Sequence, residues 1–231
     1  QMVSQYFAKK GFPVSTASDG LEAAKLVLAQ RFDLVLADLN MPHLDGWGML
    51  RLLREDARTR ELPVAFVSAH DDYRESLRAL NAGAQAYLSK GTKLEAIVWQ
   101  VRKLLEPRET MAAQLTRGEP ITVSLGVVGP QWFLRQVAAM RLSGTLQVRD
   151  GWAQYQLLVN AGQVFAASAI AGKFTATGER AFNAFIASRS ADGVWNPGNP
   201  PQGEPNLMNT TEHLIQLACH TINANEAQMR D

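Results

Sequence analysis

Three residues with side chains suited to phosphoryl chemistry lie in the first half of the sequence, and each follows a short apolar run. They are Asp38, Ser68 and Lys90. Short apolar runs bounded by turn residues are typical of buried strands in a parallel sheet, and functional groups gather at the carboxyl ends of such strands. A carboxylate there can act as a nucleophile and form an aspartyl phosphate, while a hydroxyl and an ammonium group can bind the phosphoryl oxygens. The three residues together predict a phosphoryl-transfer site at one edge of a sheet.

The elements that would position this site alternate between helix and strand. Helices are indicated by apolar spacing and by start and stop signals, including two predicted capping boxes, Asp19 with Glu22 and Thr92 with Glu95. Such alternation is typical of an α/β fold with a doubly wound parallel sheet. The predicted helices cover residues 2–10, 19–28, 46–55, 72–82 and 92–105, and the predicted strands cover residues 13–17, 33–38, 63–68 and 86–90.

The motifs around the three residues resemble those of a response regulator receiver domain. The resemblance covers residues 1–106 and implies a CheY-like, flavodoxin-like fold. The matching motifs are Asp38 with Asn40-Met41-Pro42 and Asp45-Gly46, then Ser68-Ala69, then Tyr87-Leu88-Ser89-Lys90.

The resemblance also implies a role for each matching residue. Asp38 would be the phosphoacceptor, Ser68 the hydroxyl that moves to the phosphoryl group, and Lys90 its cationic partner. Tyr87 would be an aromatic switch that turns inward on activation. Asp38 and the backbone carbonyl of Asn40 would be ligands of Mg²⁺.

Two features depart from the family pattern. Receivers open with a strand that ends in an acidic pair and holds Mg²⁺, and here that strand is expected upstream of Gln1, because the helix at residues 2–10 reads as the first crossover helix. Gly91 stands where the family usually has proline, so Lys90 is expected in a less rigid loop. His43 and His70 are expected to be solvated loop residues rather than catalytic ones.

The second half reads as a different module. The α/β alternation stops at Glu106, residues 107–120 form a polar linker that extends the preceding helix, and residues 121–231 form a smaller α+β domain with an antiparallel meander. A loop is predicted over residues 196–206. The predicted strands cover residues 121–125, 144–149, 153–160, 163–168 and 193–195. Two predicted helices begin near Pro130 and Gly178, and a final helix carries Leu214, Ile215, Leu217, Ala218 and Ile222.

This half resembles a PATAN-type domain, named for the PatA N-terminus. The resemblance covers residues 120–228 and implies a bacterial signalling module that contacts other proteins, without a catalytic set. The matching segments are Leu142-Ser143-Gly144-Thr145-Leu146-Gln147-Val148, Asn160-Ala161-Gly162-Gln163-Val164-Phe165-Ala166-Ala167 and Gly178-Glu179-Arg180-Ala181-Phe182.

The second half offers no further chemistry from its sequence. His213 and His220 share a helix face beside Cys219, but a zinc site needs ligands that the sequence does not place near them. Most of its large aromatic residues are expected in the core, and the rest on an interaction surface. These aromatic residues are Trp132, Phe133, Trp152, Phe185 and Trp195.

The amino-acid composition argues against binding to nucleic acid and to membranes. The chain has 231 residues, and 23 Lys and Arg against 22 Asp and Glu leave a formal charge of +1. This balance gives no electrostatic footprint for nucleic acid or an anionic membrane. A single cysteine, Cys219, fits a reducing cytoplasm. No apolar run reaches the roughly 18 residues that a membrane-spanning helix needs.

The main hypothesis is a two-component response regulator, not itself an enzyme, whose Asp38 is phosphorylated by a histidine kinase. Its output would be a protein–protein interaction through the C-terminal domain, and residues 72–105 are a candidate homodimer face. The alternative is an adaptor or scaffold with an unphosphorylated pseudo-receiver. A DNA-binding regulator is disfavoured because the charge is near neutral and the sequence has no recognisable helix-turn-helix.

Overall fold

The chain divides into two compact units, Gln1–Glu106 and Pro107–Asp231. The structure, a computed structural model, describes residues 2–69, 72–199 and 202–230. One helix, α5 (Leu94–Leu115), begins in the first unit and ends in the second.

The first unit contains a three-stranded parallel sheet in the order β1-β2-β3. The strands are β1 (Val35–Ala37), β2 (Val64–Ser68) and β3 (Ala86–Ser89). The helices that precede α5 are α1 (Met2–Lys9), α2 (Gly20–Ala29), α3 (Gly46–Glu55) and α4 (Tyr73–Asn81).

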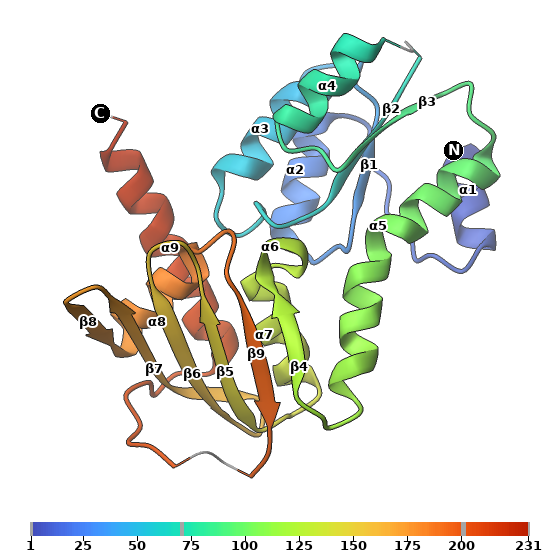
Figure 1. The fold of residues 1–231 in the computed structure, drawn as a ribbon. Coiled ribbons are helices and arrows are strands. Elements are labelled where there is room, and N and C mark those ends of the chain that lie inside the picture. The colour runs from blue at the N-terminus through green and yellow to red at the C-terminus, as the bar shows by residue number, and fades with distance from the viewer. Residues whose placement is uncertain (1, 70–71, 200–201, 231) are drawn as a thin grey trace. The chain divides into compact units, whose positions relative to one another are not determined.

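Helices cover both faces of this sheet, as the predicted doubly wound fold requires. Figure 1 shows α2, α3 and α4 on one side of the strands and α1 and α5 on the other. Two hydrophobic clusters correspond to these two sides. One contains Met49 and Leu53 of α3 packed with Phe66 of β2, and the other contains Phe7 of α1 packed with Ile97 of α5.

One of the two predicted capping boxes is present. The Asp19 carboxylate accepts a hydrogen bond from the Glu22 N–H at 2.8 Å, and the Glu22 carboxylate accepts one from the Ser18 N–H at 2.6 Å. The predicted box of Thr92 with Glu95 is wrong, because α5 begins at Leu94 and the Glu95 carboxylate accepts the Tyr6 hydroxyl at 2.8 Å instead. The Glu95 carboxylate therefore bonds to Tyr6 of α1 and not to the backbone of its own helix start.

The strand predicted over residues 13–17 is also wrong. These residues are exposed and form no ladder with any strand in the part of the chain that the structure describes. A strand requires a neighbour to accept and donate its backbone hydrogen bonds. Extended local preference alone therefore does not produce a strand here.

The second unit is built on a six-stranded antiparallel sheet in the order β4-β9-β5-β6-β7-β8. The predicted strands are all present, while β8 and the short helix α6 (Leu125–Val128) were not predicted. The strands are β4 (Ile121–Ser124), β5 (Gly144–Arg149), β6 (Gln154–Asn160), β7 (Gln163–Ala171), β8 (Phe174–Thr177) and β9 (Asp192–Pro197).

Three helices pack against one face of this sheet (Figure 1): α7 (Pro130–Ala139), α8 (Gly178–Ala187) and α9 (Thr211–Gln228). Burial alternates along β5 and β6, as expected for a sheet with one covered face. Phe133 of α7 meets Trp195 of β9 edge to face with ring centroids 6.0 Å apart, and both side chains are buried. The core of this unit lies between the helices and the sheet.

None of the helices described is both long enough and apolar enough to cross a bilayer.

Candidate functional site

Asp38 and Lys90 meet at the carboxyl ends of the first unit's strands. Asp38 directly follows β1, Lys90 directly follows β3, and the Lys90 ammonium group forms an ion pair with Oδ2 of Asp38. Ser68 is the last residue of β2, the strand between them, and its carbonyl accepts a hydrogen bond from the Lys90 N–H at 2.6 Å. The sheet thus carries a carboxylate, a hydroxyl and an ammonium group on three adjacent strand ends.

The three side chains differ in exposure. The side chains of Asp38 and Lys90 are 27% and 47% exposed, whereas Ser68 is completely buried. An exposed carboxylate can be reached by a large phosphodonor such as another protein. A buried hydroxyl reaches a group bound to that carboxylate only if the chain around it moves.

The loop after β1 holds the Asp38 carboxylate and leads directly into α3. The Asn40 N–H donates to Oδ1 of Asp38 at 3.2 Å. Gly46, the first residue of α3, donates its N–H to the Leu39 carbonyl at 2.9 Å. A Cβ at Gly46 would lie 2.6 Å from the Asp38 carbonyl oxygen, so only glycine allows α3 to begin this close to the strand end.

Tyr87 connects the strand ends to α4. Its hydroxyl donates to Oε2 of Glu75 at 2.9 Å, and its side chain also hydrogen-bonds Ser68. Burial raises the pKa of Tyr87 above its usual 10, and Glu75 adds to this effect while the Ser68 hydrogen bond opposes it. The phenol therefore stays protonated at neutral pH and bridges the site hydroxyl to a helix.

Glu75 was missed in the sequence. It lies three residues after Asp72, which caps α4, and this spacing suggests only a carboxylate in the first turn of a helix. Its contact with Tyr87 depends on how α4 packs on β3, which no local pattern encodes.

His43 contacts Asp19 rather than Asp38. Its Nδ1 lies 2.9 Å from Oδ2 of Asp19, and the imidazole is 76% exposed. The pKa of Asp19 is lowered, mainly by the Glu22 N–H and further by His43, and burial opposes the shift. These contacts give His43 no role at the strand ends, and His70 lies outside the described residues.

The described residues supply two candidate oxygen ligands for Mg²⁺, the Asp38 carboxylate and the Asn40 carbonyl. Mg²⁺ prefers octahedral oxygen coordination, with one or two carboxylates supplemented by phosphate oxygens and water. Among the residues that the structure describes, no group of three or more Asp, Glu, His or Cys side chains is arranged to hold a metal. Since Asp38 is already paired with Lys90, these two donors alone do not fit a Mg²⁺ site, and the Mg²⁺ prediction stays a prediction.

Gly91 follows the site lysine in an open turn. Its N–H donates to the Ser89 hydroxyl at 3.2 Å, and a Cβ at this position would make only an ordinary contact with that oxygen. The space around Gly91 therefore does not require glycine, in contrast to Gly46.

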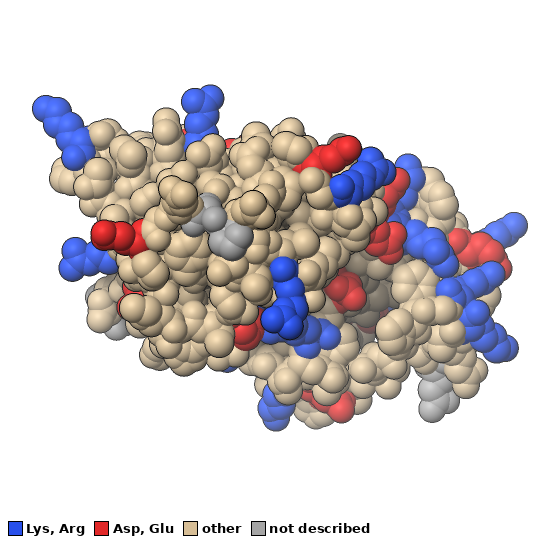
Figure 2. Space-filling model, turned by 90° about the horizontal axis from the view of Figure 1, so that it is seen from below, with Lys and Arg blue, Asp and Glu red and all other residues tan. Residues whose placement is uncertain are grey.

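In the second unit, the predicted histidines lie exposed on α9, and Cys219 is buried between them. Trp132 is half-buried, whereas Trp152 is 89% exposed and is therefore not a core residue. On the face seen in Figure 2, basic and acidic side chains are interspersed, and no extended area of one sign forms there.

Asp, Ser and Lys thus lie on adjacent strand ends of a parallel α/β sheet, as the sequence predicts. Residues 1–102 match the family "Response regulator receiver domain". The first unit is accordingly a receiver domain with the CheY-like, flavodoxin-like fold, followed by a second, sheet-rich unit.

The most similar relatives include named transcriptional regulators. "Probable transcriptional regulator ycf29" of Porphyra purpurea is 33% identical over 103 residues, 45% of this chain and 49% of that protein. "DNA-binding dual master transcriptional regulator RpaA" of a Synechocystis strain is 27% identical over 146 residues, 61% of each chain. The chain thus spans about half to three-fifths of the length of these curated relatives.

Two solved structures have regions similar to part of this chain. The receiver domain of the Francisella response regulator 1452 has 29% identity and a TM-score of 0.44, covering 47% of this chain and 88% of its own. Vibrio cholerae chemotaxis protein CheY4 has 26% identity and a TM-score of 0.43, covering 45% of this chain and 86% of its own.

Proposed function

We propose that this protein is a two-component response regulator in which a histidine kinase phosphorylates Asp38. The observation that carries the proposal is the Asp38–Lys90 ion pair at the sheet edge, with Ser68 on the strand between the two residues. A kinase-bound phosphohistidine is the donor that this exposed carboxylate fits.

In the proposed reaction, an Asp38 carboxylate oxygen attacks the phosphorus of the phosphohistidine. The new O–P bond forms as the N–P bond breaks, and the electron pair of the broken bond stays on that nitrogen. The other ring nitrogen of the phosphohistidine carries a proton, so the imidazole leaves as a neutral group. Lys90 offsets the negative charge that accumulates on the phosphoryl oxygens.

The phosphoryl group then changes which hydrogen bonds are favourable. Its oxygens accept strongly, so they draw the Ser68 hydroxyl away from Tyr87. The Tyr87–Glu75 contact on α4 is thereby weakened or rebuilt, and the population shifts between two arrangements of α4 and β3. This shift is the signal that the receiver passes on.

The output in this proposal is a protein–protein interaction through the second unit, which we assign to the PATAN type. The protein would act in the cytoplasm as a switch rather than as an enzyme, with residues 72–105 as a candidate dimer face. Within the described part of this unit, the exposed histidines and buried Cys219 form no metal-binding group.

An adaptor with an unphosphorylated pseudo-receiver is the second candidate. It is favoured by one observation, the lack of further acidic ligands beside Asp38 among the described residues. Regulation of transcription, the role named for several relatives, would require a DNA contact, and the near-neutral charge of the chain gives this contact little electrostatic support.

The test is labelling of the protein by a phosphohistidine kinase domain or by radiolabelled acetyl phosphate, with and without Mg²⁺. We expect an acid-stable, hydroxylamine-labile label on the unchanged protein, none on Asp38→Ala, and labelling about 10²-fold slower on Lys90→Ala. Asp33→Ala, which removes an exposed carboxylate just before β1, is the matched control and should label normally. Equal label on the unchanged protein and on Asp38→Ala would contradict the proposal.

A further inference from the structure

Two neighbouring hairpin turns of the second unit expose large aromatic side chains. Trp152, in the turn between β5 and β6, is 89% exposed, and Phe174, at the turn between β7 and β8, is 82% exposed. The pairing of Gln154 with Ile170 places both turns at the same end of the sheet. Ile170 is itself 51% exposed. Large apolar side chains gathered at one exposed place commonly mark an interaction site.

The turn that carries Trp152 is held in place by Asp150. One carboxylate oxygen of Asp150 accepts the N–H groups of Trp152 and Ala153, both at 2.8 Å, and the other accepts the hydroxyls of Tyr155 and Ser188, both at 3.0 Å. These bonds already fix the backbone of the turn. The turn therefore loses little further conformational entropy when a partner binds the indole. Such preorganisation favours binding.

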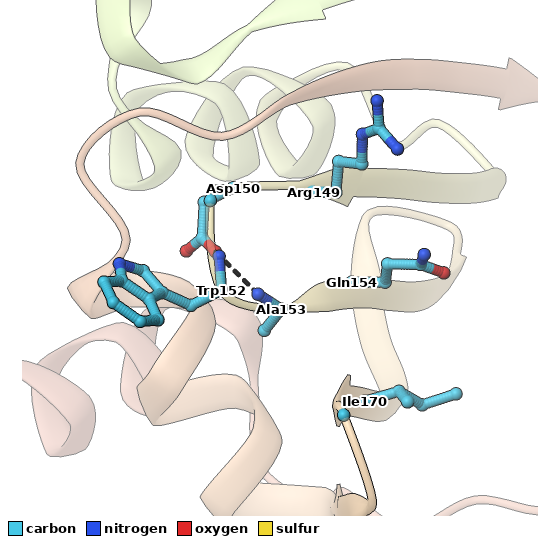
Figure 3. Close-up of a pocket in the computed structure, with 8 residues that line it drawn as sticks. Arg149, Asp150, Trp152, Ala153, Gln154 and Ile170 are labelled. Atoms are coloured by element: carbon cyan, nitrogen blue, oxygen red, sulfur yellow. Dashed lines mark hydrogen bonds between the residues drawn. The ribbon is translucent and has the colours of Figure 1, made fainter.

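A shallow cavity of about 610 Å³ lies beside this turn, lined by residues of both hairpins. Figure 3 shows the side chains of Gln154 and Ile170 extending in the same direction, Arg149 extending upward from β5, and the Trp152 indole projecting from the turn in the opposite direction. The cavity has room for one or two side chains of a partner. We call the residues Arg149, Trp152, Gln154, Ile170, Lys173 and Phe174 the hairpin-tip surface.

The two basic side chains of the hairpin-tip surface form no ion pairs with other described residues. The side chains of Arg149 and Lys173 are exposed and form no ion pair or hydrogen bond within the part of the chain that the structure describes. Two carboxylates lie near these cations: Asp150, whose oxygens accept four hydrogen bonds, and Asp192, which pairs in register with Arg149 and accepts the Ser124 hydroxyl. Two free cations and a free amide thus border an apolar surface.

We propose that the hairpin-tip surface docks a protein segment that carries an apolar side chain flanked by carboxylates. The apolar side chain would enter the cavity that Trp152 and Ile170 both line, and the carboxylates would pair with Arg149 and Lys173. This inference rests on the proposed role of the second unit as a protein-binding output, and it names the chemistry of the partner. Tryptophan and arginine are the residue types that most often dominate binding energy at such interfaces.

A bilayer surface fits the same residues less well. The cavity between the turns offers a concave, partly polar site that suits an inserted side chain, and Gln154 provides a directional hydrogen-bonding group inside it. Two cations give only weak attraction to anionic lipid, because binding to such surfaces uses clusters of about four or more basic residues. The experiment therefore includes lipid vesicles, so that binding to a membrane can be distinguished from binding to a protein segment.

The experiment selects random dodecapeptides displayed on phage against the immobilised full chain, and measures the selected peptides by fluorescence anisotropy. We expect enrichment of apolar residues next to Asp or Glu. Trp152→Ser and Arg149→Glu should each weaken binding at least tenfold. Both side chains are exposed, so both variants should fold, which circular dichroism checks.

Matched controls change the same residue types elsewhere. Trp99→Ser removes a tryptophan that is 53% exposed on α5, and Arg141→Glu reverses an exposed charge at the opposite end of the same sheet. Both should leave affinity within twofold. Asp38→Ala should bind the selected peptides as the unchanged chain does. A failure of the proposed phosphorylation can then be distinguished from a failure of the proposed binding surface.

Three results would overturn the proposal. The first is no enrichment of acidic–apolar peptides. The second is equal binding of enriched peptides to Trp152→Ser and to the unchanged chain. The third is Trp152-dependent binding to vesicles of phosphatidylcholine and phosphatidylserine without peptide binding, which would assign the surface to a membrane.

Discussion

At the scale of single residues, both carboxylate oxygens of Asp150 accept hydrogen bonds, four in all. Burial acts to raise the pKa of Asp150, but the Trp152 and Ala153 N–H groups and the Ser188 and Tyr155 hydroxyls outweigh it and lower the pKa. Burial, together with Asp150, raises the pKa of Tyr155 to about 12, so its hydroxyl remains a donor throughout the neutral and acid range.

These shifts give a prediction for stability. Asp150→Ala should lower the free energy of unfolding by about 2–3 kcal/mol at pH 7, because it removes charge-assisted hydrogen bonds and leaves their donors without an acceptor. A carboxyl with a lowered folded-state pKa stabilises the fold fully above its unfolded pKa, about 3.9, and loses that effect as the pH falls through the folded pKa. The difference between variant and unchanged protein should therefore shrink from pH 5 toward pH 2.

Urea denaturation followed by circular dichroism at several pH values measures this difference. Glu204→Ala, which removes an exposed carboxylate of the same unit, should change stability by less than about 0.5 kcal/mol. A difference for Asp150→Ala that grows as the solution becomes acidic would contradict the assigned direction of the pKa shift.

At the scale of elements, Arg54 ties the end of α3 to the loops before β2 and β3. Its guanidinium donates to the Leu62 carbonyl at 3.0 Å, to the Gly83 carbonyl at 2.8 Å and to the Gln85 side chain at 3.1 Å. Gln85 in turn accepts the Val64 N–H at 2.7 Å. Burial lowers the pKa of Arg54 to about 10, so the group remains charged at neutral pH.

We expect Arg54→Ala to destabilise the first unit by about 2–3 kcal/mol, because two loop carbonyls and an amide oxygen lose a charged donor. Arg51→Ala is the matched control: it lies one turn earlier on α3, is exposed, and has no hydrogen bond or ion pair in the described chain. Thermal or urea unfolding of both variants tests this. Equal stability of the two variants would show that the Arg54 contacts contribute nothing.

Most elements of both units could be predicted from sequence because their signals are local. The apolar run before Asp38, the Asp19–Glu22 cap and proline at the start of α7 each act within a few residues. The same locality placed Asp38, Ser68 and Lys90 on three strand ends, since parallel strands bring their carboxyl ends together.

The elements that could not be predicted depend on partners distant in sequence. Residues 13–17 have strand-like composition but no neighbouring strand in the described chain, and β8 forms as the edge neighbour of β7 despite weak local patterning. Likewise, Glu75 joins the site only through the packing of α4, and Trp152 departs from the expectation that tryptophan is core. In each case tertiary contact, or its absence, overrides local preference.

At the scale of the whole molecule, α5 is the element that physically connects the two units. In the first unit it packs on α1 through Ile97 and Val101, and in the second its buried Arg108 donates to the Val128 carbonyl at 3.1 Å. Pro107 lies inside the helix at the boundary, where it cannot donate a hydrogen bond to the preceding turn. Both ends of the helix thus contact the unit to which they belong. One backbone hydrogen bond is missing between these contacts, at Pro107.

The proposed switch therefore predicts a specific pattern of hydrogen exchange. Phosphorylation of Asp38 should alter amide exchange over residues 73–106 several-fold, because α4 and β3 rearrange. A smaller change should continue over residues 107–115, because the second half of α5 is continuous with the first and Pro107 only partly uncouples it. Mass-spectrometric exchange on the full chain, with and without acetyl phosphate, measures both regions, and Asp38→Ala should show neither change. If the change stopped at Glu106 in the phosphorylated protein, α5 could not be the route by which the receiver reaches its output unit.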